Sequence, residues 1–482
     1  MRAFLILFLL FCLVCSKSFA RHGNFPIDSS HSSLPYDSIE DEKSNNVYVI
    51  IDDIKLSGNR ITKDFIILRE ITFKKGETIA LPHLYKELER SREQIYNTTL
   101  FVDDSVYISS QKGNVVSIKI VVKERWYLFP LPYFKLADRN FNTWWTEENR
   151  SLDRINYGIK FMEMNLTGRN DKLDLWLING YTQQLTARYQ IPYLDKALTK
   201  GLNIGVSYAT QHEINYATGT DNKQLFYKEG DIAETSFRTD LSFTYRPNQR
   251  FKHIFRVSYN KEEISDSIFL LNQNFFLNNS TTMEFSDFTY TLQYTNADYN
   301  AYPTKGLLYE ISLNGKHINN NINTGMVSAH AIGAFHLLKN TFVLLEGSAA
   351  ISFPPQNYYS GLNMFGYGNF QMHGYEYYVV DGVGGLLGKI AIHQRLFKYV
   401  LKNPAPSKTH DRVPFIFYLK VYSDYGYCYN PYDNTSVLNN QLMRSWGVGL
   451  DIVSIYDFVF KIEWSINQLG IYGAYLHTRN DF

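Results

Sequence analysis

Residue types that carry enzyme chemistry occur in this chain, but not at the spacings that the chemistry requires. Gly382, Gly384, Gly385 and Gly388 could suggest a phosphate-binding loop, yet they are spaced differently from a dinucleotide loop and no helix is expected after them. The 12 His are scattered along the chain rather than grouped as metal ligands. No zinc-protease, nucleophile-elbow or P-loop pattern is present. We therefore expect no catalytic residue, no metal site and no cofactor in a protein that is not an enzyme.

The first residues indicate export from the cytoplasm. Arg2 is followed by an apolar stretch over residues 3–15, and Ser18 and Ala20 supply small residues at the −3 and −1 positions of a cleavage site. That stretch is shorter than the about 20 apolar residues of a membrane-spanning helix, so a signal peptide over residues 1–20 is favoured over an anchor. Residues 21–46 are polar and lack a hydrophobic period, which predicts a flexible leader.

The composition excludes nucleic acid as a partner. Arg2 and Lys17 leave with the signal, so the remaining chain has 46 basic and 47 acidic residues, whereas nucleic-acid-binding proteins carry a basic surplus. Cys428 remains as the only cysteine, which excludes an internal disulfide. The 37 Tyr and 33 Phe are many for a chain with a mean hydropathy of −0.27. An aromatic load of this kind is typical of a membrane barrel, whose interfaces carry aromatic girdles.

Residues 47–124 predict a compact α/β domain in the order β-α-α-β-β. The residues Leu81, Leu84, Tyr85, Leu88 and Ile95 recur at helical spacing and predict one buried helix face. The expected elements are a strand over 47–55, a short helix capped by Thr62 and running through Ile71, a helix over 81–96, and strands over 101–109 and 115–123. We expect this unit to fold alone.

Residues 125–482 predict a mainly β fold, an antiparallel transmembrane β-barrel of about sixteen strands. Apolar or aromatic residues alternate with mostly polar ones, for example over residues 237–245, 288–294, 446–452 and 458–466. Many runs exceed ten residues, which matches the roughly 9–11 of a tilted spanning strand and favours a barrel over a soluble sandwich. Candidate strands start near residues 126, 155, 171, 184, 202, 235, 251, 286, 306, 325, 341, 386, 414, 443, 457 and 470.

Phrases in both parts of the chain resemble one known family. IKLSGNRIT, YNTTLF and VVKERW resemble a POTRA domain, although that family usually has Gly where Thr99 stands. NLTGRND, IPYLDK, YPTKG, HGYEYYVVDG and YSDYGY resemble the barrel of BamA/TamA-type outer-membrane assembly and translocation proteins, also known as the bacterial surface antigen barrel. The Tyr- and Asn-rich character is similar to a branch in Bacteroidetes-like bacteria. This resemblance implies a bacterial outer-membrane protein with its N-terminal domain in the periplasm.

The resemblance also implies a loop that folds back into the lumen. In the family an Arg-Gly-aromatic tip contacts the barrel wall, and the matching residues here are His373, Gly374 and Tyr375. The acidic wall partners map to Asp424 and Asp451, both of which face the lumen in the expected alternation. Because His replaces Arg, we expect the tip contact to respond to pH around neutrality. An ordinary outer loop is the alternative.

Two further features concern the first and last strands. Pro130 and Pro132 lack an N–H, which predicts a weak lateral seam against the last strand, where Gly470 and Gly473 add flexibility. The alternative places both prolines in a lead-in before the barrel. The terminal Phe482 resembles the C-terminal signal that targets barrels to their assembly machine.

Two functions remain open. The first is a non-enzymatic insertion or translocation factor, with a POTRA domain that guides client strands by β-augmentation. One POTRA unit is few for a central insertase, which favours a specialised or accessory paralogue. Its expected partners are unfolded outer-membrane or secreted polypeptides, the lipid bilayer, and periplasmic chaperones or lipoproteins. The alternative is a pore-forming or structural barrel whose outer loops bind a ligand.

Overall fold

The computed structural model describes residues 47–136, 144–145, 150–152, 155–228, 232–319, 322–402 and 412–479. The expected signal peptide, the leader and Phe482 lie outside these residues. Within them, no helix is both long enough and apolar enough to cross a membrane.

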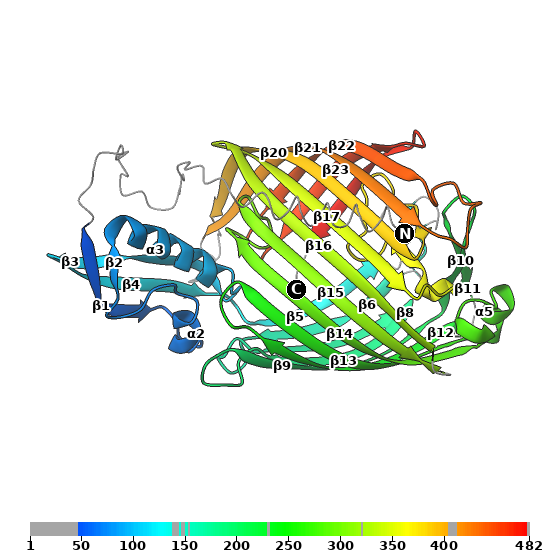
Figure 1. Cartoon of the computed structure of the whole chain (residues 1–482), viewed down its shortest axis with the longest axis horizontal. Helices are drawn as coiled ribbons and strands as arrows, with labels where there is room; N and C mark the ends of the chain where they lie inside the picture. The colour runs from blue at the N-terminus through cyan, green and yellow to red at the C-terminus, as the bar shows by residue number, and fades with distance from the viewer. Residues whose placement is uncertain are drawn as a thin grey trace. The chain divides into compact units, whose positions relative to one another are not determined.

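The N-terminal part of this structure is a four-stranded sheet with helices (Figure 1). Its strands run in the order β2-β1-β4-β3, with β1 and β4 parallel and the other pairs antiparallel. The elements are β1 (Tyr48–Ser57), α2 (Asp64–Leu68), β2 (Thr78–Ala80), α3 (Leu81–Tyr96), β3 (Phe101–Lys112) and β4 (Val115–Glu124). The expected α/β unit is confirmed, with one addition. Strand β2 is only three residues long, too short to produce a readable alternation in the sequence.

Two local details of this unit differ from expectation. Lys63 is the N-cap residue of α2 and no side chain caps this helix, because the Thr62 hydroxyl lies 2.9 Å from the Tyr127 hydroxyl instead. Helix α3 buries Leu84, Leu88, Ser91 and Ile95, whereas Tyr85 of the expected face is 54% exposed and Leu81 is only partly buried. Capping propensity alone therefore did not predict the start of α2, because Tyr127 competes for the Thr62 hydroxyl.

Thr99 occupies the turn between α3 and β3 with a φ of 62°. A β-branched residue rarely adopts this left-handed conformation, whereas glycine adopts it without steric cost. The departure from the POTRA pattern therefore places a strained residue at the position where the family usually has Gly.

The remaining chain forms one sixteen-stranded antiparallel sheet, which confirms the predicted strand number. Each strand pairs with the next strand in the series, and the described residues do not close the sheet by pairing β24 with β5. The strands are β5 (Leu128–Leu136), β6 (Ile155–Met164), β7 (Lys172–Gly180), β8 (Thr182–Ile191), β9 (Lys200–Gln211), β12 (Glu234–Tyr245), β13 (Phe251–Ile264), β14 (Thr282–Ala297), β15 (Gly306–Ile318), β16 (Ile322–Leu338), β17 (Thr341–Phe353), β20 (Gly384–Lys402), β21 (Arg412–Tyr429), β22 (Leu442–Val453), β23 (Val459–Asn467) and β24 (Tyr472–Arg479).

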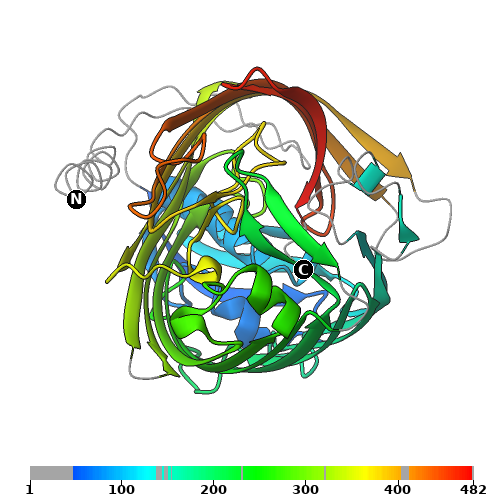
Figure 2. The ribbon, with the colours of Figure 1, turned by 90° about the vertical axis from the view of Figure 1, so that its right-hand side faces the viewer.

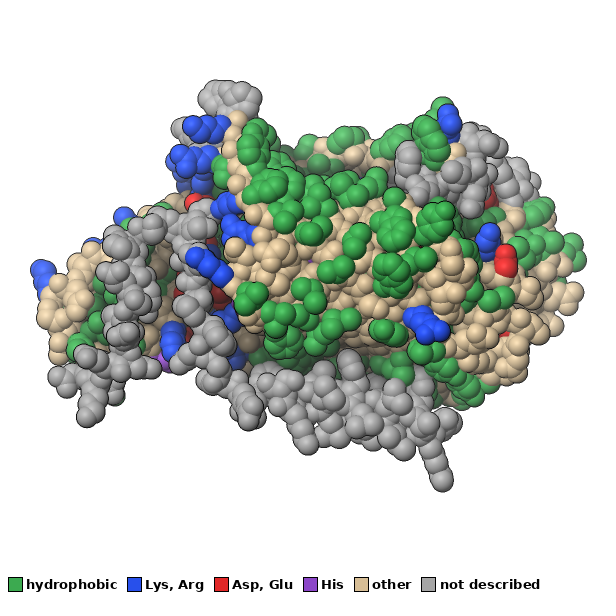
Figure 3. All heavy atoms as spheres, turned by 90° about the horizontal axis from the view of Figure 1, so that it is seen from above, with side chains coloured by type: hydrophobic (Ala, Val, Ile, Leu, Met, Phe, Trp, Pro, Cys, Tyr) green, Lys and Arg blue, Asp and Glu red, His purple; other side chains and the backbone are tan. Residues whose placement is uncertain are grey.

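The two faces of this sheet have the polarity of a membrane barrel. In β12, Leu241 is 51% and Phe243 is 39% exposed, while Asp240 and Ser242, which alternate with them, are each 4% exposed. A soluble protein buries the opposite set of side chains, so the outward apolar face fits lipid and the inward polar face fits a wet lumen. Hydrophobic side chains are spread over the outer surface of the strands in Figure 3.

Connections at the two ends of the strands differ in length. The end at which β5 begins has short turns such as residues 339–340, between β16 and β17. The opposite end holds the small hairpin β10 (Glu213–Thr218) and β11 (Gln224–Lys228), helix α5 (Asp266–Leu271), and residues 354–383, which include β18 (Asn363–Phe365) and β19 (Val380–Asp381). We call this opposite end the loop end. Figure 2 views it directly, with residues 354–383 in yellow inside the ring of strands.

Candidate functional site

Residues 354–383 are held inside the ring of strands by an apolar cluster. Buried side chains of this loop pack against inward-facing residues of β17, β20, β21 and β22. Gly426 on β21 makes room for the loop, since a Cβ there would lie 2.7 Å from the Phe365 ring. The loop members are Met364, Phe365, Phe370, Met372, Tyr375, Tyr378 and Val380, and the wall members are Ala350, Leu387, Cys428 and Met443.

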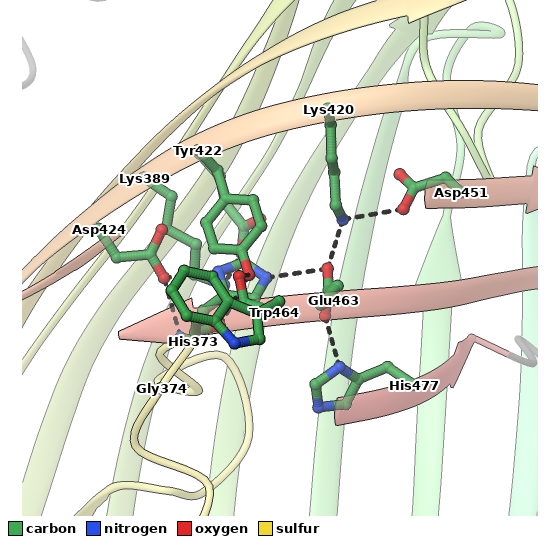
Figure 4. A network of polar contacts seen from close by, with 12 residues as sticks. His373, Gly374, Lys389, Lys420, Tyr422, Asp424, Asp451, Glu463, Trp464 and His477 are labelled. Atoms are coloured by element: carbon green, nitrogen blue, oxygen red, sulfur yellow. Dashed lines mark hydrogen bonds and ion pairs between the residues drawn. The ribbon is translucent and has the colours of Figure 1, made fainter. Parts of the chain in front are cut away.

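The loop tip places His373 between two carboxylates of the wall (Figure 4). Asp424 of β21 is completely buried and accepts hydrogen bonds from the His373 backbone N–H at 2.9 Å and from Nδ1 at 2.6 Å. The His373 Nε2 lies 3.3 Å from Oε1 of Glu463 on β23. The structure thus brings together the predicted pair of His373 and Asp424, and adds a second acid.

Gly374 and Tyr375 complete the contact with the wall. Gly374 has a φ of 80°, and a Cβ at this position would lie 3.3 Å from the Ser465 Cβ and 3.5 Å from the Ser445 Cβ. Its carbonyl accepts a hydrogen bond of 2.7 Å from the Asn467 side chain. The Tyr375 hydroxyl donates to the Arg444 carbonyl at 3.1 Å. The tip therefore touches three successive strands, and glycine is favoured at this position by its positive φ, while a Cβ there would be in close contact with Ser465.

Glu463 connects the tip to the last strand. One carboxylate oxygen contacts His373 and forms a short ion pair with Lys420, and the other lies 2.5 Å from Nδ1 of His477 on β24. The Nε2 atom of His477 also lies 3.9 Å from Glu376, three residues beyond His373 in the loop. Glu463 and His477 therefore form a continuous polar path from the loop tip to β24.

Asp451 lies one step away from this path. It faces the lumen as predicted, but its partners are Lys420 at 2.9 Å, His393 at 3.5 Å and the Tyr302 hydroxyl at 3.0 Å. Lys420 bridges Asp451 to Glu463, so Asp451 reaches the tip only through two intervening side chains.

The charge state of His373 follows from its surroundings. Burial alone would lower the pKa of its imidazole, but the carboxylates of Asp424 and Glu463 outweigh burial and raise this pKa to about 9. Because this pKa is raised, the contact stabilises the folded protein fully below the ordinary histidine pKa of 6.5. This stabilisation is lost as the pH rises through about 9. The transition expected near neutrality is thus moved into the alkaline range by Asp424 and Glu463 together.

Cysteines replacing His373 and Asp424 should form an internal cross-link under mild oxidation. Cys428 is fully buried and leaves the readout clear. A protein with cysteines at Leu270 and Asp424 is the matched control, because Leu270 is 75% exposed on α5 and should not cross-link to residue 424. A single cysteine at 373 should also react slowly with a membrane-impermeant maleimide in whole cells. Labelling at 373 as fast as at 270 would show that the tip does not lie in the lumen.

The predicted seam residues lie at both ends of the strand order. Pro130 and Pro132 are within β5, paired with Phe161 and Ile159 of β6, so they are not in a lead-in before the sheet. Gly473 lies in β24. Gly470, expected on the last strand, instead lies in the turn before it with a φ of 74°.

Three site residues were not predicted from the sequence: Lys420, Glu463 and His477. All are charged or titratable residues within strands, and Lys420 and Glu463 have the inward phase of the alternation. This phase was a usable signal for their orientation. Among the residues with described positions, no group of three His, Cys, Asp or Glu side chains is arranged to hold a metal ion.

Comparison with known proteins gives two family matches. The Omp85 superfamily domain matches residues 165–388, and the POTRA model, described as a surface antigen variable number repeat, matches residues 49–125. No curated protein matches the chain. BamA from Haemophilus ducreyi lacking POTRA domains 1–3 has 13% identity and a TM-score of 0.49, covering 89% of this chain and 83% of that chain. CdiB from Acinetobacter baumannii has 11% identity and a TM-score of 0.49, covering 89% and 73%. CdiB from Escherichia coli has 10% identity and a TM-score of 0.46, covering 93% and 92%.

Proposed function

This chain belongs to the Omp85 superfamily of outer-membrane insertion and translocation proteins, and we propose that it is a specialised or accessory paralogue with its own polypeptide clients. In this proposal clients enter through a lateral seam between β5 and β24. Like the transport and assembly factors of the family, it performs no enzymatic step.

The polar path from the loop tip to β24 carries the proposal. Glu463 holds His373 of the loop and His477 of the last strand at the same time. A movement of the loop therefore changes the contacts of a strand that lies at one end of the sheet order. A plain pore has no need for such a link, whereas a seam that opens for a client strand does.

The prolines of β5 support a weak seam. Successive N–H groups of a strand point to opposite sides, and Pro130 and Pro132 share one side because they are two residues apart. Since β5 keeps its pairing with β6 through both positions, the two missing donors are best accommodated on the side away from β6. Closure on that side would lack up to two ladder bonds, each worth about 0.5–1.5 kcal/mol net in water.

The four-stranded sheet offers an edge for client recognition. β3 is twelve residues long and lies at the end of the strand order, with β4 as its neighbour on one side. A long edge strand can accept an extended peptide by β-augmentation. We place this domain in the periplasm because short turns are typical of the periplasmic end of bacterial barrels, and the chain enters β5 at that end.

Depletion of this protein, followed by quantitative profiling of the outer membrane and the secreted fraction, should lower a small set of barrel or secreted polypeptides. The bulk of outer-membrane proteins should stay constant. A general loss of barrels would contradict a specialised role and indicate a central insertase. An unchanged profile with altered permeability to small solutes would favour the pore-forming alternative.

A further inference from the structure

A polar cavity of about 200 Å³ lies among the connections at the loop end of the sheet. Residues from four connections line it: the β10–β11 hairpin, the segment after α5, the 354–383 loop, and the connection between β21 and β22. The lining comprises six Asn, two Asp, two Tyr, one Thr and one Ser beside Ala217 and Leu362, and none of the lining residues is Lys or Arg. This cavity is separate from the lumen tip, because none of the tip residues lines it.

The cavity walls are fixed by buried amide side chains. The Asn222 amide donates to Asn439 Oδ1 at 3.1 Å, and its oxygen accepts from the Leu438 backbone N–H at 2.8 Å. The Asn430 amide donates to the Asp381 carbonyl at 2.9 Å. These bonds tie three connections that are distant in sequence, so the cavity is preformed and does not require ordering when a ligand enters.

Asp381 provides an acceptor without a partner. The residue is 8% exposed, and its Oδ1 atom is buried without a hydrogen-bond partner among the described residues, although the Thr218 hydroxyl also interacts with this carboxyl. Burial raises the pKa of this carboxyl to about 6, so it is mostly ionised at neutral pH. A buried acceptor of this kind is costly unless a ligand or solvent donor satisfies it. The cavity therefore favours a ligand rich in hydrogen-bond donors.

The other lining residues narrow the class of ligand. Two carboxylates without a cation disfavour phosphate, sulfate or an acidic sugar. Asp433 is already engaged by Thr435 and Ser436, so Asp381 alone would offer calcium a free carboxylate oxygen, whereas calcium sites are usually built on several carboxylates. Tyr432, which is 43% exposed, offers a flat apolar surface beside the polar groups. A ligand that matches these features is a neutral ring that carries hydroxyl groups as hydrogen-bond donors and has apolar C–H faces for contact with Tyr432.

We propose that this cavity binds one neutral sugar ring of a glycan, with Asp381 accepting hydrogen bonds from its hydroxyl groups and Tyr432 covering one face. The cavity is smaller than the roughly 300–1,000 Å³ of sites for drug-sized ligands, which fits a single ring rather than an oligosaccharide. Sugar binding does not depend on the proposed transport function, since it uses a different set of residues at the loop end.

The test uses the full-length protein in detergent and measures saturation-transfer NMR with glucose, galactose, mannose and N-acetylglucosamine. At least one should give saturable binding, and glucuronate should give none. Asp381→Asn should weaken binding by about tenfold or more, because the amide cannot replace a charged acceptor. Asp266→Asn on the exposed first turn of α5 is the matched control and should bind as the parent does. Heat-modifiable migration confirms that each variant is folded.

Three results would overturn the proposal: no saturable binding with any of the four sugars, tighter binding of glucuronate than of the neutral sugars, or unchanged binding in Asp381→Asn. Titration with calcium chloride completes the test. Saturable calcium binding that is lost in Asp381→Asn would assign the cavity to a cation instead.

Discussion

A disulfide that joins β5 to β24 should abolish insertion or translocation while leaving the protein folded. Cysteines at Tyr133 and at one of Tyr472, Ala474 or Leu476 scan the possible registers between the two strands, and Cys428 is buried and inert. If clients enter between these strands, a covalent bond there removes the route and activity should fall to background. Reduction of the disulfide should restore it.

The control for this experiment is a disulfide within an existing strand pair. Ile462 of β23 and Leu476 of β24 are register partners with outward side chains, so a bond between them adds no constraint on the seam. This protein should stay active when oxidised. Cross-link yield is read from gel migration, and activity is compared at matched yield. Full activity in the β5–β24 cross-linked protein would exclude the lateral seam and favour passage through the lumen.

Replacement of Glu463 by glutamine should release the loop from the wall and strongly destabilise the barrel. Glu463 is 2% exposed and faces Lys420, His373 and His477, so its loss leaves His373 and the buried Lys420 short of a counter-charge. Removal of one partner from a buried ion pair costs about 3–5 kcal/mol. The measurement is the urea midpoint at which heat-modifiable migration is lost, together with the activity of the folded fraction.

Glu284→Gln is the matched control for this charge change. Glu284 lies 3.5 Å from Lys261, and both side chains are more than 40% exposed, so their pairing is worth only about 0–1 kcal/mol. The urea midpoint of the Glu284→Gln protein should stay close to that of the parent protein. Equal midpoints for Glu463→Gln and Glu284→Gln would show that the buried network does not hold the loop.

The strands were predictable because lipid and lumen impose opposite polarities on successive residues. Leu241 and Asp240 illustrate this, since one is half exposed and the other buried as the alternation requires. The same alternation identifies Asp424 and Asp451 as inward residues, but it cannot give their height in the lumen. That height depends on the stagger between strands and on how deeply the loop enters, and only Asp424 is level with His373.

Contacts that combine residues distant in sequence were the least predictable. His373, Glu463 and His477 come from a loop and two strands, and no spacing in the sequence relates them. Gly470 illustrates a smaller error of the same kind. The last strand begins at Tyr472, two residues later than expected, because the start of a strand is set by its pairing with the neighbouring strand. The resemblance to the family supplied the tip residues, and the structure supplied Glu463, which raises the pKa of His373 together with Asp424.

The strand order also has a consequence for the protein's own biogenesis. Every pairing in the large sheet joins strands that follow one another in the series, so each can form as a local hairpin. The longest connection inside the series, residues 354–383, spans about 30 residues, whereas joining β5 to β24 closes roughly 340, at an added entropic cost of about 2 kcal/mol. Ring closure is therefore expected to be the last and slowest step of folding. The contacts between β5 and β24 would then be the last to form in the finished barrel.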